Sequence, residues 1–250
     1  MSQPPALARY LLALADDELV LAHRNSEWTG HAPILEEDIA FANIALDEMG
    51  HANLWYQQVQ ALTGQSPDQL VFFRDAADFR CAQLVELPKG DWAFSMLRQY
   101  LFDAAEAVRL PALAASPERA LAEPAAKIRT EEIYHYRHTA AWIKRLGLGT
   151  EESQRRLQAA LDALWPYARQ LFVPLPGEAE LAAEGLGPGS AAVQREWEAL
   201  VLPRLREAGL RLPATRQPAA TDRAQHSEHL PALLEEMQAV ARLEAPETEW

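Results

Sequence analysis

The sequence has little of what stabilises small secreted or sheet-rich proteins. Its 250 residues include only one cysteine, Cys81, and 11 glycines. A single cysteine excludes an internal disulfide and is typical of proteins kept in a reducing compartment. β-Branched runs and Asn-Gly turns are scarce, whereas Ala, Leu, Glu, Gln and Arg recur throughout. This composition predicts an all-α protein located in the cytoplasm.

The sequence also lacks a long hydrophobic run and an excess of positive charge. A membrane helix requires about 18 or more apolar residues without charge, and we find no such stretch. The apolar N-terminal stretch has no basic leader and is interrupted by Asp16, Asp17 and Glu18, so we expect neither a signal peptide nor a membrane contact. The net charge is −13, whereas nucleic-acid binding requires a basic face. We therefore expect no nucleic-acid partner.

Apolar residues recur at spacings of three and four, as in amphipathic helices. The segments with this spacing are approximately 6–26, 34–63, 91–115, 119–146, 151–172, 190–209 and 227–243. Residues 64–90 form a long connection between the second and third helices, and a four-helix bundle with one long crossover has ferritin-like connectivity. We therefore predict one ferritin-like domain over 1–250, with a core bundle at about 6–146 and additional C-terminal helices at about 151–243.

Two of the four long helices carry an inward-facing Glu-x-x-His pair. The second helix has Glu48 and His51 on its apolar face, and the fourth has Glu132 and His135 in the same arrangement. Side chains at positions i and i+3 lie on one side of a helix, so each pair converges. Ferritin-like dimetal proteins combine two such pairs with one carboxylate from each of the other two helices.

The first and third helices offer carboxylates on the corresponding faces. Glu18 and Asp103 fit the inward register, with Asp17 and Glu106 as alternatives, because helix phase read from a sequence is accurate to about one position. Burying such groups without compensation costs on the order of several kcal/mol each. The predicted ligands of two iron or manganese ions are Glu18, Glu48, His51, Asp103, Glu132 and His135. The alternative is a buried hydrogen-bond network without metal.

The remaining polar clusters are weaker candidates. His138 fits a surface or outer position near the predicted ligands. His226 and His229 open the last helix, where capping and solvent exposure are the simpler interpretation. Cys81 lies beside Arg80 without an evident base, so packing is the simpler interpretation.

Several strings spread over nearly the whole chain carry a family resemblance. They are Asn25-Ser-Glu-Trp28-Thr-Gly30-His31-Ala-Pro33, Asp38-Ile-Ala-x-Ala42-Asn43-Ile-x-Leu46-Asp47, Phe73-Arg74-Asp75, Glu86-x-Pro88-x-Gly90-Asp91-x-Ala93, Arg98-Gln-Tyr100-x-x-Asp103-Ala, Tyr134-His135-x-Arg137, Trp142-x-x-Arg145-Leu-Gly147 and His226-x-Glu228-His229-Leu. In these strings the sequence resembles the C subunits of bacterial phenylacetyl-CoA epoxidase, a multicomponent monooxygenase of aerobic phenylacetate degradation.

The resemblance implies a ferritin-like structural subunit that pairs with a catalytic A subunit. The wider complex includes a flavin and iron–sulfur reductase and a small B subunit, and the di-iron centre of the A subunit epoxidises the ring of phenylacetyl-CoA. C subunits are generally described as having lost metal ligands. The present sequence departs from that pattern, because both Glu-x-x-His pairs are intact and Glu18 and Asp103 are available to complete a site.

The resemblance therefore leaves alternatives of different classes. The first is an auxiliary subunit that packs against the catalytic partner through a face near Trp28, His31 and Trp55. The second is a di-iron oxygenase or oxidase in its own right, and the third is an iron-storage or stress protein. The cations suggested for contact with the phosphates of phenylacetyl-CoA are Lys127, Arg129, Lys144 and Arg145.

Overall fold

The computed structural model describes residues 4–243, and no strand occurs among them. Residues 1–3 and 244–250, which the predicted domain includes, lie outside the described part. The helices are α1 (Ala6–Ser26), α2 (Leu35–Thr63), α3 (Pro67–Phe72), α4 (Gln83–Glu86), α5 (Trp92–Ala114), α6 (Arg119–Gly147), α7 (Glu151–Gln170), α8 (Glu178–Ala183), α9 (Ser190–Glu207) and α10 (Leu230–Gln238), with 3₁₀ turns η1 (Ala76–Asp78) and η2 (Ala241–Leu243). The predicted all-α class is confirmed.

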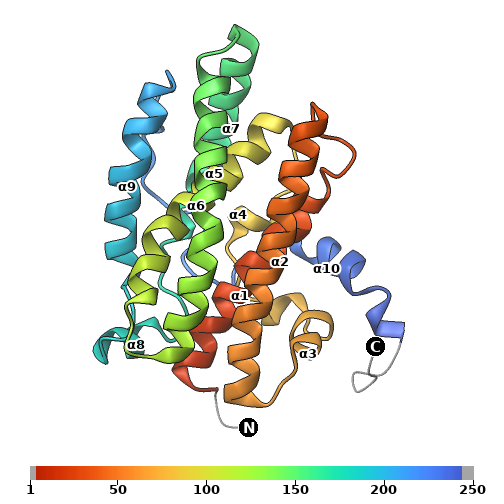
Figure 1. Cartoon of the computed structure of the whole chain (residues 1–250), viewed down its shortest axis with the longest axis vertical. Helices are drawn as coiled ribbons and strands as arrows, with labels where there is room; N and C mark the ends of the chain where they lie inside the picture. The colour runs from red at the N-terminus through yellow and green to blue at the C-terminus, as the bar shows by residue number, and fades with distance from the viewer. Residues whose placement is uncertain (1–3, 244–250) are drawn as a thin grey trace.

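Four long helices, α1, α2, α5 and α6, form the bundle that Figure 1 shows. Helix α1 packs along α2, α5 packs along α6, and α2 also contacts α6. The connection between α2 and α5 contains the short elements α3, η1 and α4 and crosses from one helix pair to the other. This long crossover confirms the ferritin-like connectivity predicted from the sequence.

The ends of the long helices have local causes in the sequence. Gly64 ends α2 with φ of 80°, a left-handed conformation that glycine adopts without a Cβ penalty. The side chain of Asp91 caps α5 by accepting a hydrogen bond from the backbone N–H of Phe94 at 2.9 Å. Thr150 and Ser153 form a capping box at the start of α7. These signals place the observed ends close to the predicted ones.

The C-terminal elements cover the bundle and are anchored to it by buried polar contacts. Helices α7 and α9 pack on α5. Trp197 of α9 is fully buried, and its indole N–H donates to the carbonyl of Leu101 at 3.0 Å. The predicted helix over 227–243 is shorter in the structure and begins at Leu230, because Pro231 occupies its first turn. Across residues 4–243, none of the helices is both long and apolar enough to cross a bilayer.

Candidate metal centre

The two Glu-x-x-His pairs face each other across the contact between α2 and α6. Glu48 and His51 lie on α2, Glu132 and His135 lie on α6, and all four side chains are buried. The centroids of the two imidazole rings are 5.9 Å apart. The i, i+3 spacing therefore directs both pairs to a common point inside the bundle.

One group of four residues has the spacing of metal ligands. Glu18, Glu48, His51 and Glu132 each offer an atom within 4.8 Å of the atoms offered by the other three. Nδ1 of His51 lies 3.8 Å from a carboxylate oxygen of Glu18 and 3.5 Å from one oxygen each of Glu48 and Glu132. Ligands about 2.0–2.2 Å from one metal ion are separated from each other by roughly 3 to 4 Å. Small shifts of these side chains would place the four atoms around one ion.

Unpartnered polar atoms mark the same point. Four buried atoms have no hydrogen-bond partner within residues 4–243: Oε2 of Glu18, Oε2 of Glu48, Nδ1 of His51 and Oε2 of Glu132. An unsatisfied buried polar group costs about 1–3 kcal/mol, and more if it is charged. A divalent cation would bind all four atoms, so the side chains present fit a metal ion.

The Nε2 atom of each histidine contacts a carboxylate on the opposite helix, outside the group of four, and this contact orients the ring. Nε2 of His51 lies 2.8 Å from Glu131 on α6, and Nε2 of His135 lies 3.1 Å from Asp47 on α2. Such a contact fixes the tautomer and leaves Nδ1 directed to the interior. Neither contact was predicted from the sequence, although an acidic residue directly precedes the glutamate in both pairs.

The two other predicted ligands, Asp103 and His135, lie beside the group of four. The side-chain amide of Gln99 donates to Glu48 at 2.7 Å and to Asp103 at 2.6 Å. Thr139 donates its hydroxyl to the second oxygen of Asp103 at 2.7 Å. The protein itself therefore satisfies Asp103.

The two alternative carboxylates form ion pairs with arginines. Asp17 pairs with Arg223 at 2.8 Å and also accepts from the backbone N–H of Ala82. Glu106 pairs with Arg109. Of the adjacent acids on α1, Glu18 is therefore the one that joins the group of four.

The electrostatics of the cluster favour bound protons on Glu18, Glu132 and His51 when metal is absent, whereas Glu48 stays ionised. Burial would raise the pKa of Glu48, but favourable interactions with Glu18 and both histidines outweigh it and hold that pKa well below its usual value. Burial, reinforced by the neighbouring Glu48, raises the pKa of Glu18 well above its usual value, and burial also raises the pKa of Glu132. Burial would lower the pKa of His51, but Glu48 and the other carboxylates outweigh it and raise that pKa to about 9. A metal ion must displace these protons, so its affinity falls as pH decreases.

A second group of potential ligands, Cys81, Glu86 and His226, is already hydrogen-bonded internally. One oxygen of Glu86 lies 3.5 Å from the thiol of Cys81 and 2.7 Å from Nδ1 of His226. The other accepts from the backbone N–H of Ser227 at 2.6 Å. Nε2 of His226 lies 3.0 Å from the carbonyl of Phe79. The predicted solvent exposure of His226 is wrong, because this residue joins the C-terminal segment to the crossover.

We expect His226→Ala to lower the free energy of unfolding by about 1–3 kcal/mol, because Glu86 would lose a partner while remaining buried. Urea unfolding followed by circular dichroism measures this change. His229→Ala is the matched control, since no side-chain hydrogen bond of His229 occurs within 4–243. Equal losses of stability in both variants would contradict the anchoring role of His226.

Comparison with known proteins identifies the family. A family model described as "Phenylacetic acid catabolic protein" matches residues 2–250. The chain is 37% identical over 246 residues to the C subunit of the 1,2-phenylacetyl-CoA epoxidase of Escherichia coli (strain K12), covering 98% of this chain and 99% of that protein. It is 26% identical over 168 residues to the A subunit of the same enzyme, covering 67% of this chain and 54% of that protein. The resemblance inferred from the sequence is thereby confirmed, and the chain belongs to the phenylacetic acid catabolic protein family.

Proposed function

We propose that the chain is the auxiliary C-type subunit of a phenylacetyl-CoA epoxidase and supports a catalytic A-type subunit in aerobic phenylacetate degradation. The full-length similarity to the C subunit of the E. coli enzyme carries this proposal. The weaker similarity to the A subunit of that enzyme supports an assembly of two related bundles. A reductase and a B-type subunit would complete the proposed complex, which acts on phenylacetyl-CoA in the cytoplasm.

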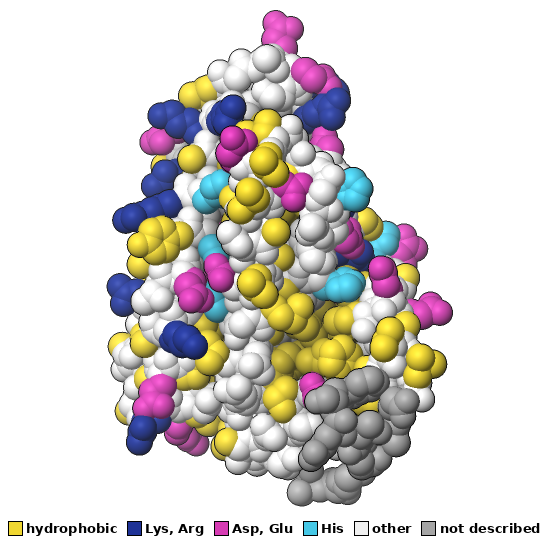
Figure 2. All heavy atoms as spheres, turned by 45° about the vertical axis from the view of Figure 1, so that its right-hand side comes forward, with side chains coloured by type: hydrophobic (Ala, Val, Ile, Leu, Met, Phe, Trp, Pro, Cys, Tyr) yellow, Lys and Arg dark blue, Asp and Glu magenta, His cyan; other side chains and the backbone are white. Residues whose placement is uncertain are grey.

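Helix α2 exposes an apolar surface that suits such a partner. We call this surface the α2 apolar face, and it consists of Leu35 (72% exposed), Ile39 (56%), Leu46 (70%) and Met49 (42%). Beside Met49, a cavity of about 420 Å³ is lined largely by apolar side chains. Figure 2 shows apolar side chains gathered on this side of the molecule. Contiguous exposed apolar surface marks interaction sites. We assign this face to the A-type subunit.

The tryptophans suggested as interface residues do not belong to such a surface. Trp28 is 8% exposed and Trp55 is 1% exposed, so the prediction is wrong for both side chains. The indole N–H of Trp28 donates to the hydroxyl of Ser95 at 2.8 Å, and its ring packs edge-on against Trp92. Aromatic side chains of this size contribute more to a core than to a surface when the bundle can enclose them.

We expect the double substitution Leu46→Lys and Met49→Lys to weaken binding of the A-type subunit by about 100-fold or more, since central apolar contacts contribute about 2 kcal/mol or more each. Binding is measured by interferometry with the co-expressed A-type subunit. Leu148→Lys is the control, because Leu148 is also exposed but lies at the end of α6, outside the α2 apolar face. Unchanged affinity in the double variant would overturn the assignment of this face.

The four unpartnered atoms favour a second role, and we infer that the core binds a divalent transition metal. Glu18, Glu48, His51 and Glu132 would hold the ion, with iron or manganese as the candidates that suit carboxylate and imidazole ligands. Such a metal supplies Lewis-acid or redox chemistry when bound. The alternative function as an oxygenase or oxidase therefore depends on this site.

A further inference from the structure

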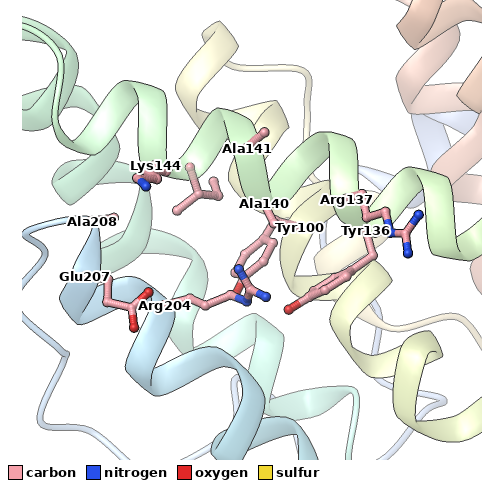
Figure 3. A pocket seen from close by; sticks show the side chains of 10 residues that line it. Tyr100, Tyr136, Arg137, Ala140, Ala141, Lys144, Arg204, Glu207 and Ala208 are labelled. Atoms are coloured by element: carbon pink, nitrogen blue, oxygen red, sulfur yellow. The ribbon is translucent and has the colours of Figure 1, made fainter.

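A cavity of about 250 Å³ lies between α5, α6 and α9, on the side of the bundle away from the α2 apolar face. Figure 3 shows Tyr100 of α5, Tyr136 and Lys144 of α6 and Arg204 of α9 around it. Small side chains such as Ala140 leave the space between the helices open. The proposed metal ligands are not among the described residues that line this cavity.

The charged side chains at this cavity are mostly cations. The described lining residues include three cations, Arg137, Lys144 and Arg204, and one acid, Glu207. No ion pair of these three cations occurs among the side chains of residues 4–243. The chain as a whole has a net charge of −13, so the charge at this cavity is locally opposite in sign. It favours an anionic ligand.

The hydroxyls of Tyr100 and Tyr136 lie close to each other, and that of Tyr136 lies close to the guanidinium of Arg204, but neither hydroxyl has a well-aligned hydrogen-bond partner in the described part of the chain. The rings of Tyr100 and Tyr136 are stacked with centroids 5.8 Å apart, and both hydroxyl oxygens are buried. Tyr100 is fully buried. Burial raises the pKa of both phenols, so both remain hydrogen-bond donors at neutral pH. Buried donors without acceptors are rare in folded proteins and call for an explanation.

The guanidinium of Arg204 adds further hydrogen-bond donors beside Tyr100 and Tyr136. Its central carbon lies 5.5 Å from the centroid of the Tyr136 ring. Figure 3 shows the hydroxyl of Tyr136 directed toward the guanidinium of Arg204, with Tyr100 beside them. Guanidinium N–H and phenol O–H groups are hydrogen-bond donors, and carboxylate or phosphate oxygens are the acceptors that match them.

We propose that this cavity binds a small oxyanion, a phosphate or a carboxylate, through Tyr100, Tyr136 and Arg204, with Lys144 as an additional cation. The site goes beyond the auxiliary role and does not depend on it. Of the cations suggested for phosphate contact from the sequence, Lys144 lines the cavity, whereas Lys127, Arg129 and Arg145 do not.

Isothermal titration calorimetry of the full chain with inorganic phosphate and, separately, with acetate at constant ionic strength tests the site. We expect saturable binding of at least one anion, and the arm that binds identifies the chemistry. Arg204→Met should weaken binding at least tenfold. Arg206→Met is the matched control, because Arg206 is also exposed on α9 but does not line the cavity. Absence of saturable binding, or equal weakening in both variants, would overturn the proposal.

The isosteric variants Tyr100→Phe and Tyr136→Phe test the hydroxyls without altering packing. Each should weaken anion binding and, in the anion-free chain, leave the thermal unfolding midpoint unchanged or higher, because an unsatisfied buried hydroxyl is removed. A lower midpoint with unaltered anion binding would show that the hydroxyls serve folding alone and would refute their role as ligand donors.

Discussion

Adding Mn²⁺ to the metal-free chain is expected to raise its thermal unfolding midpoint, and Glu48→Ala or Glu132→Ala is expected to abolish this rise. Within residues 4–243, both glutamates have one buried oxygen without a hydrogen-bond partner at the point where four ligand atoms converge. A ligand at 100 times its Kd stabilises the folded state by about 2.7 kcal/mol, which corresponds to about 5–10 °C for a chain of this size. Differential scanning calorimetry measures the midpoint with and without metal.

Glu123→Ala is the matched control for Glu132→Ala. Glu123 also lies on α6, but its side chain is exposed and pairs with Arg119. The control should keep the full metal-dependent shift. If wild type shows no shift, or if both ligand variants retain it, the core is the metal-free hydrogen-bond network that is the alternative to a metal site.

Metal content should be roughly one ion per chain rather than two, because Gln99 occupies the space between Glu48 and Asp103 in which a second ion would bind. An amide NH₂ supplies two donors, and Gln99 uses them on Glu48 and Asp103, where a second cation would need those oxygens. Inductively coupled plasma mass spectrometry after reconstitution gives the stoichiometry. A value near two would show that Gln99 moves aside.

The long helices could be predicted from the sequence because their apolar periodicity extends over many turns. The predicted 6–26 is identical to α1, and the ends of α2, α5 and α6 differ from prediction by at most one residue. The short helices α3, α4 and α8 lie inside predicted connections. Helices of four to six residues contain too few positions for a periodic pattern, and packing against longer helices stabilises them.

The convergence of the two Glu-x-x-His pairs could also be predicted, because i, i+3 spacing determines a shared face. The role of Gln99 could not, since a glutamine in the apolar stripe of a helix gives no sign of which carboxylates its amide will contact. Cys81 and His226 are 145 positions apart in the sequence, so their junction through Glu86 depends on the path of the crossover and the C-terminal segment. Local patterns do not determine such tertiary contacts.

Adjacent acids on α1 should respond to substitution in opposite ways, and this is the second large effect that we expect. Asp17→Ala should lower the free energy of unfolding by about 3–5 kcal/mol, because it leaves Arg223 buried without a counter-charge. Both side chains of this pair are 1% exposed. The same substitution also removes the acceptor of the Ala82 backbone N–H. Urea unfolding of the metal-free chain measures the loss.

Glu18→Ala should leave the stability of the metal-free chain unchanged or higher and should strongly weaken metal binding. The carboxylate of Glu18 has a buried oxygen that is unpartnered within residues 4–243, and the neighbouring Glu48 and Glu132 oppose its ionisation. Because its pKa is raised, Glu18 is held in the neutral form, and its removal relieves a desolvated acid that makes no ion pair with the nearby His51. Asp17→Ala, in contrast, should keep metal binding under conditions in which the chain remains folded. Equal losses of stability in the two variants would refute this division of roles. Loss of Asp17 removes the counter-charge of Arg223, whereas loss of Glu18 leaves His51 with the closer carboxylates of Glu48, Glu131 and Glu132.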